Sequence, residues 1–184
     1  IPLGLVMLMF VSIQMTTPTL LNSVIEEKMQ RISEVLLASV STFQLLAGKL
    51  LAGVSVGLTF SVVYLVSLAG VLGYFEKAEW VPAGTYFWFL LFLVTGLLVF
   101  GSLFAGVSSA CQDLKDSQNF AGTIILFLLI PMMLSIVAVE SPDGPLAVVL
   151  SLVPPFSVMG MMVRLAVPPG PSVVMVILSL VLNL

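Results

Sequence analysis

Long apolar runs alternate with short polar segments along this chain. Four of the runs are nearly free of charge and long enough to cross a hydrocarbon core of ~30 Å, which takes about 20 helical residues. They cover residues 1–22, 43–74, 85–110 and 120–139, and a fifth run begins near residue 172. We therefore expect an all-α, polytopic helical membrane protein with about five spans. Pro18 and Pro131 are expected to kink their helices.

Residues 23–39 interrupt this pattern, because they form the only charged segment with clear helical amphipathicity. Its apolar positions recur at helical spacing, at Ile25, Met29, Ile32, Val35 and Leu36. Its charged positions are Glu26, Glu27, Lys28, Arg31 and Glu34. Ser23 followed by Glu26 fits a capping box, which predicts that the helix starts at Ser23. We expect a separate helix along the membrane surface whose polar face meets water or another protein.

Residues 140–171 are largely apolar but broken by prolines. After a turn at 140–145, the run at 146–153 is too short to cross a membrane, and the run at 156–167 contains Arg164. The intervening Pro154–Pro155 would leave carbonyl groups unsatisfied inside a single span. The pattern favours two short re-entrant or interfacial helices over one crossing. Arg164 is a membrane-embedded charge that needs a partner, for which Glu140 or a lipid phosphate is a candidate.

Two glycines and one lysine stand out in the run at 43–74. Gly53 and Gly57 form a G-x-x-x-G pattern, which lets another helix pack closely. Glycine is also frequent in membrane helices without such a role, so both interpretations stay open. Lys49 lies near the start of the run, and we expect its side chain to reach the lipid headgroups.

Composition limits the classes of function. Hydrophobic residues make up 60% of the chain and charged residues 8%, and the mean hydropathy is +1.23; the chain is therefore expected in a lipid bilayer. A net charge of −3 leaves no basic surface for nucleic acid. With one cysteine and no histidine, an internal disulfide, a zinc site and a histidine-based triad are excluded. Carboxylates near span ends are explained as solvated charges, so we assign no metal site and no catalytic residue.

The sequence contains no Walker A motif. Gly48–Lys49 is followed by Leu50, and Phe43 stands where the leading glycine is required. We therefore expect no cofactor in this chain.

Basic residues divide unevenly between the two sides of the membrane. Lys28, Arg31, Lys49 and Lys115 fall on one side, and Lys77 and Arg164 fall on the other. The positive-inside rule then places the 23–39 helix and the 111–119 loop in the cytoplasm and the 140–171 segment outside.

Two motifs resemble a known family. The first combines Glu26, Glu27, Lys28, Arg31, Glu34, Leu36, Leu37 and Ser39 with the following Leu45-Leu46-Ala47-Gly48-Lys49. The second is Pro154-Pro155-Phe156-Ser157 with Arg164. At this spacing the chain resembles the permease subunit of ABC-2 type exporters, especially the sodium-exporter NatB-like branch. Many members of that family have proline at the positions where this chain has Val40 and Val158, but neither difference affects a charged position.

The resemblance implies a single, partial permease domain over residues 1–184, which lacks the first span and an extracytoplasmic domain of the whole protein. Both ends of the chain lie inside apolar runs, as expected of a fragment. The 23–39 segment would be the cytoplasmic coupling helix that contacts a separate ATPase subunit, which binds ATP and Mg²⁺. The implied contacts are Glu26, Glu27, Lys28, Arg31 and Glu34. A second permease would complete a homodimer or heterodimer in the inner membrane.

Other functions stay open at this point. The charged face of 23–39 could be a solvated surface held by local pairs worth ~0.3–0.5 kcal/mol each. An ATP-independent channel or secondary transporter, and a structural membrane scaffold, are the alternative functions. For an exporter, the substrate could be sodium, a peptide, a drug or a lipid-like molecule.

Overall fold

The structure, a computed structural model, describes residues 2–29, 41–77, 79, 81–111, 114–168 and 170–183. Over these ranges it is helical and contains no strand. The helices are α1 (Pro2–Met29), α3 (Thr42–Tyr74), α4 (Ala83–Ala110), α5 (Leu114–Glu140), α6 (Pro145–Leu150), α7 (Ser157–Ala166) and α8 (Val173–Asn183). The predicted all-α polytopic fold is confirmed.

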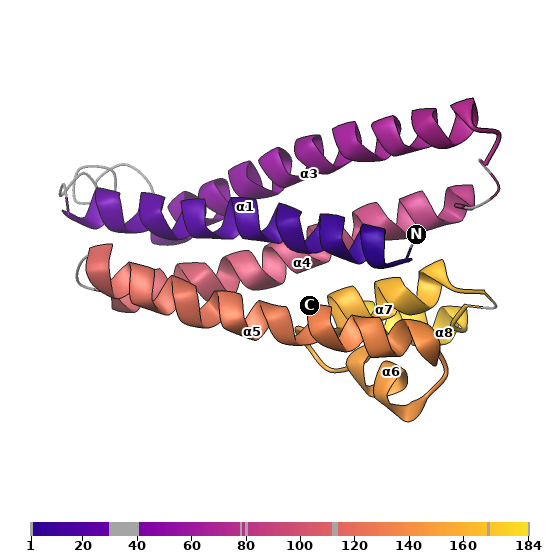
Figure 1. Ribbon diagram of the computed structural model, residues 1–184. Coiled ribbons are helices and arrows are strands. Elements are labelled where there is room, and N and C mark those ends of the chain that lie inside the picture. The colour runs from indigo at the N-terminus through magenta and orange to yellow at the C-terminus, as the bar shows by residue number, and fades with distance from the viewer. Residues whose placement is uncertain are drawn as a thin grey trace.

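Four long helices form the body of the protein. Figure 1 shows α1, α3, α4 and α5 running lengthwise beside one another, and α1 packs against each of the other three. Each contains a segment long and apolar enough to cross a membrane, namely Pro2–Glu27, Thr42–Tyr74, Gly84–Ser108 and Gly122–Glu140. The structure describes the fifth predicted span only as α8, which has 11 residues.

The two ends of this bundle carry different elements. At one end, here called the Lys49 end, α1 and α4 finish and α3 and α5 begin (Figure 1). At the other, the Arg164 end, α1 and α4 begin, α3 and α5 finish, and α6, α7 and α8 gather. Lys49 and Lys115 therefore lie at the end opposite to Lys77 and Arg164, as the alternation of the spans predicted.

The predicted helix start at Ser23 is wrong. α1 continues without a break from Pro2 to Met29, and the Ser23 hydroxyl donates to the Leu20 carbonyl oxygen (2.8 Å) instead of capping a new helix. Burial explains the continuation, because Ile25 is fully enclosed in an apolar cluster against α4. The capping box belongs to Ser41 and Gln44 at the start of α3. Residues 30–40 of the predicted surface helix lie outside the described residues.

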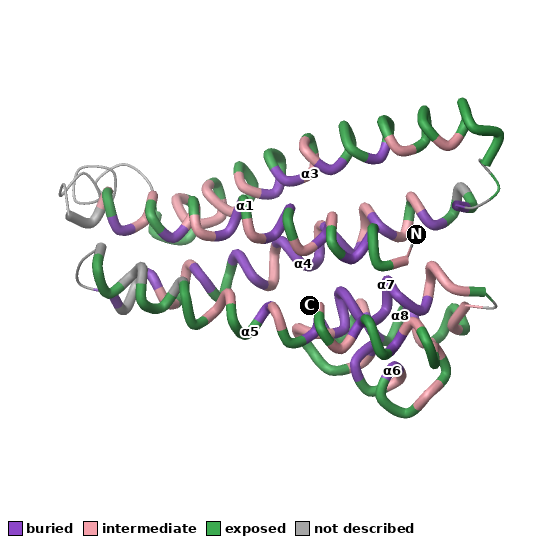
Figure 2. The backbone as a smooth tube through the Cα atoms, in the orientation of Figure 1, coloured by how far each residue is buried: buried purple, intermediate pink, exposed green. Residues whose placement is uncertain are grey.

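The apolar core lies where the long helices face one another. Figure 2 shows buried positions along the inner sides of the bundle and exposed ones along its outer sides. Three phenylalanines of α4, Phe89, Phe92 and Phe100, are fully enclosed at its centre. The outer faces are apolar too, as a bilayer-embedded helix bundle requires.

Two short helices replace a single crossing in the 140–171 segment. α6 ends at Leu150 and α7 starts at Ser157, and the Pro154–Pro155 bond between them is cis. α7 packs against α1, α4, α5, α6 and α8, and all its residues from Ser157 to Arg164 are buried. α7 is therefore the central element of the Arg164 end.

Gly160 is the point where α7 meets α6 most closely. A Cβ atom there would lie 2.7 Å from both the carbonyl carbon and the carbonyl oxygen of Leu150. Because these are backbone atoms, a side chain cannot be accommodated by a rotamer change alone.

We expect Gly160→Ala to lower the free energy of unfolding by about 1–3 kcal/mol, since it overpacks this helix contact. Gly70→Ala is the matched control, because nothing lies within 4 Å of a Cβ atom at this glycine of α3. Alanine favours helix over glycine by up to about 1 kcal/mol, so the control should be neutral or stabilising. Denaturant titration in mixed micelles measures both variants, and equal stability would contradict the packing described here.

Candidate functional site

A charged contact joins α1 to α3 at the Lys49 end. The Lys49 ammonium nitrogen lies 2.7 Å from the Glu27 carboxylate oxygen Oε2 and donates to the Ser23 carbonyl oxygen at 3.0 Å. The Lys49 side chain is 16% exposed and that of Glu27 is 29% exposed. We call these three groups the Lys49 clamp. The expectation that Lys49 reaches the headgroups is corrected, because its ammonium group makes these contacts within the protein.

A crevice lies beside the clamp between α1 and α3. It has a volume of about 250 Å³ and is lined by Thr16, Thr19, Leu20, Ser23, Lys49, Ala52, Gly53 and Val56. Thr16, Thr19 and Ser23 donate their hydroxyl protons to carbonyl groups of α1 itself. Their oxygens add polarity to an otherwise apolar wall.

Gly53 and Gly57 lie where α3 comes close to its neighbours. A Cβ atom at Gly53 would lie 2.9 Å from Leu20 of α1. At Gly57 it would lie 2.7 Å from Leu97 of α4 and 3.3 Å from Thr16 of α1. Both predicted packing positions are thus helix contacts with no room for a side chain unless the neighbouring side chains move.

A buried pair of hydroxyl groups joins the same two helices further from the Lys49 end. Ser12 and Ser61 are fully buried, and their hydroxyl oxygens lie 2.8 Å apart. Ser12 donates its own proton to the Leu8 carbonyl oxygen (2.7 Å), so Ser61 is the donor to Ser12. The α1–α3 interface therefore combines a charged contact at its end with close glycine contacts and a buried hydroxyl pair along its length.

The structure describes the side chains of two of the five predicted coupling residues, Glu26 and Glu27. Glu26 is exposed in the last turn of α1, whereas Glu27 is turned to Lys49. Lys28 belongs to the same turn, but its side chain lies outside the description. Arg31 and Glu34 fall outside the described residues.

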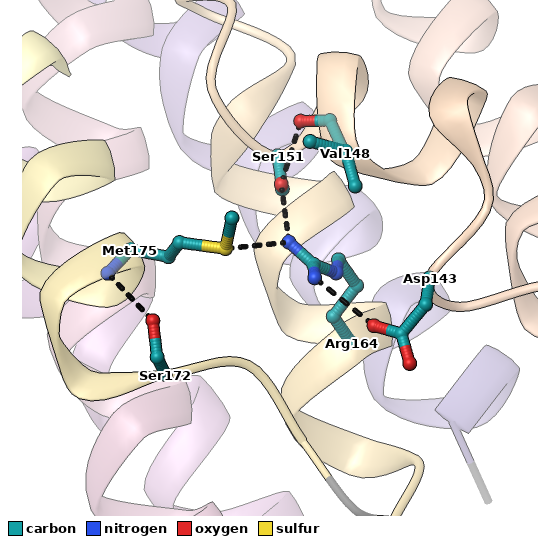
Figure 3. Close-up of polar contacts among 6 residues, drawn as sticks. All are labelled: Asp143, Val148, Ser151, Arg164, Ser172 and Met175. Carbon is teal, nitrogen blue, oxygen red and sulfur yellow. Dashed lines mark hydrogen bonds and ion pairs between the residues drawn. The ribbon is translucent and has the colours of Figure 1, made fainter.

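A second charged contact holds the Arg164 end together (Figure 3). Arg164 of α7 is 4% exposed; its guanidinium donates to the Ser151 hydroxyl (3.1 Å) and to the Met175 sulfur (3.5 Å), and lies 3.2 Å from the Asp143 carboxylate. The candidate partner Glu140 is wrong. Glu140 is the exposed last residue of α5, while the turn that follows brings Asp143 over α7.

Arg164 therefore links the turn after α5, the end of α6 and the start of α8. Asp143 is largely solvated, with 73% of its side chain exposed. The Arg164 Nε atom is buried and has no hydrogen-bond partner in the described part of the chain. α7 and α8 share another polar contact, in which the Asn183 amide donates to the Ser157 hydroxyl (2.5 Å).

Comparison with known proteins identifies the family. The family model described as ABC-2 family transporter protein matches residues 3–184, nearly the whole chain. The chain belongs to the ABC-2 transporter family. Members of this family are multi-pass membrane transport components that normally pair with an ABC ATPase subunit and are not themselves the ATPase.

Two relatives of this ABC-2 chain have also been matched. It is 32% identical over 155 residues to an uncharacterised protein of Methanocaldococcus jannaschii, covering 84% of this chain and 38% of that protein. It is 26% identical over 177 residues to the uncharacterised protein YhaP of Bacillus subtilis, covering 88% of this chain and 42% of YhaP. The chain thus spans about two fifths of the length of both relatives. No solved structure matches the chain.

Sequence reasoning missed two partner residues of this ABC-2 chain. Lys49 is the only charged residue between Glu34 and Glu76, a signal that it needs a partner, but the pattern does not say that Glu27 provides it. Asp143 is one of the carboxylates near span ends that the pattern explains as solvated charges, and its contact with Arg164 depends on how α6 and α7 fold back.

We expect Arg164→Ala to lower the free energy of unfolding by about 2–5 kcal/mol, the range for emptying a buried site of a long side chain. Asp143→Asn should cost less than about 1 kcal/mol, because the exposed carboxylate is screened by water. Lys115→Ala, at an exposed position of the other end, is the control. Denaturant titration in micelles ranks the three; an Asp143→Asn effect as large as that of Arg164→Ala would show that the ion pair, rather than the burial of Arg164, holds this end.

Proposed function

We propose that the chain is the membrane-spanning permease part of an ABC exporter, which moves its substrate out of the cell with ATP hydrolysed on a separate subunit. The observation that carries the proposal is the family match over residues 3–184. The helical bundle supports it, with four helices long enough to cross a membrane and polar groups placed between them. The Glu26–Glu27–Lys28 motif favours the sodium-exporter NatB-like branch.

The proposed orientation places the Lys49 end in the cytoplasm. Four basic residues belong to this end by sequence position, namely Lys28, Arg31, Lys49 and Lys115. Two belong to the other end, and one of them, Arg164, is buried against Asp143. The positive-inside rule therefore favours a cytoplasmic Lys49 end in the inner membrane, with α6–α8 on the outer side.

The proposed ATPase contact begins at the end of α1. Glu26 is exposed there, and Arg31 and Glu34 follow it in the sequence. Glu27 has a partner in Lys49 and is thus assigned to the clamp rather than to the contact. ATP and Mg²⁺ would be bound by the ATPase, and a second permease would complete a homodimer or heterodimer. The first span and the extracytoplasmic domain implied by the resemblance would belong to the rest of the protein.

Affinity purification of the full-length protein, co-expressed with the ATPases encoded beside its gene, tests this function. We expect one ATPase to remain bound in mild detergent. Glu26→Lys should weaken its binding about tenfold, which corresponds to about 1.4 kcal/mol, because it reverses a charge at the proposed contact.

Glu140→Lys is the matched control, because Glu140 is an exposed glutamate at the opposite end of the bundle. Its Kd for the ATPase should equal that of the wild type. If no ATPase is retained by the wild-type protein, or if both reversals weaken binding equally, the proposed coupling surface is contradicted.

A further inference from the structure

Lys49 is a charged residue in an otherwise uncharged membrane helix. No other charged residue occurs in α3 (Thr42–Tyr74), and its ammonium group is mostly removed from water. A lysine in such a place is costly unless it reaches water or finds partners. Glu27 and the Ser23 carbonyl group are those partners, and both belong to the end of α1.

The clamp sits at the two helix ends that flank residues 30–40. Glu27 lies in the last turn of α1, and Lys49 is the eighth residue of α3. When the chain between these helices is displaced, the movement reaches the membrane bundle through the end of α1 and the start of α3. An ion pair with an additional hydrogen bond to the backbone ties the two ends together, because separating them would leave the Lys49 ammonium without its partners.

The rest of the α1–α3 interface is held by uncharged contacts. Gly53 and Gly57 bring α3 close to Leu20 and Thr16 of α1, and Ser61 is hydrogen-bonded to Ser12. A crevice of about 250 Å³ lies beside the clamp. Among the residues that the structure describes, the Glu27–Lys49 pair is the only ion pair between these two helices. It is therefore the contact that ties the end of α1 to the start of α3.

We propose that Lys49 is a positioning residue that ties α1 to α3 as one unit, so that movement at the Lys49 end is passed into the membrane bundle. This role rests on the proposed function, since it requires a nucleotide-driven displacement at the Lys49 end. Lys49 acts through its contacts with Glu27 and the Ser23 carbonyl group. Its loss uncouples movement of the membrane helices from nucleotide turnover.

Distances between spin labels in the full-length permease–ATPase complex test the proposal in lipid nanodiscs. The labels replace exposed residues. One pair joins Met15 of α1 to Val66 of α3, and the other joins Val66 of α3 to Leu126 of α5. Each pair is measured without nucleotide and with ATP plus vanadate. In the wild type we expect the α1–α3 distance to stay constant while the α3–α5 distance shifts.

Lys49→Gln should broaden the α1–α3 distance distribution, make it depend on nucleotide and reduce the α3–α5 shift at least twofold. Lys49→Arg keeps the charge and should behave like the wild type. Lys115→Gln removes an exposed lysine at the same end and is the matched control. Glu27→Gln breaks the pair from the other side with little change in volume, so it gives the same test if Lys49→Gln does not fold.

The outcomes separate the two proposals. If Lys49→Gln and Glu27→Gln keep a constant α1–α3 distance and the full wild-type shift of the α3–α5 distance, the clamp has no coupling role and the inference is overturned. If the wild-type complex forms but nucleotide shifts no distance, or if no complex forms, the proposed function fails and the clamp's role fails with it.

Discussion

A charged side chain among apolar helices has to find a partner inside the protein or reach water, and this requirement organises both ends of the bundle. Lys49 meets it by crossing from α3 to Glu27 and the Ser23 carbonyl of α1. Arg164 meets it by contacting Asp143, Ser151 and Met175 around α7. In each case one cation joins segments that are distant in sequence. The apolar surfaces between the ends provide most of the burial.

The two contacts suggest different behaviour at the two ends. Around α7, the buried Arg164 and the close approach of Gly160 to the Leu150 backbone favour a tightly packed cap. Between α1 and α3, close glycine contacts and a buried hydroxyl pair run along the interface, a crevice lies beside them, and the clamp is a single charged contact at the end. In an ABC exporter whose ATPase acts at the Lys49 end, this contact would connect the moving segment to the spans, which adopt alternative packings during transport.

The sequence was sufficient for the elements that depend on local pattern. Long uncharged runs located the four long helices, and Pro154–Pro155 separated α6 from α7. It misplaced the features that depend on tertiary contacts. The Ser23–Glu26 box looked like a helix start, yet burial of Ile25 against α4 carries α1 past it. Likewise, Lys49 and Arg164 showed that partners were needed, whereas Glu27 and Asp143 could be chosen only once the helices were packed.

The proposed function requires the Lys49 end of the bundle to face the cytoplasm, where an ATPase can reach it. Cysteine accessibility tests it most directly, in a Cys111→Ala background that removes the buried native thiol. Lys115→Cys reports the Lys49 end and Glu76→Cys the Arg164 end, both at exposed positions. A membrane-impermeant maleimide added to intact cells should label Glu76→Cys but not Lys115→Cys, and inside-out vesicles should reverse this result. Labelling of Lys115→Cys from outside the cell would place the coupling segment on the wrong side of the membrane and contradict the account.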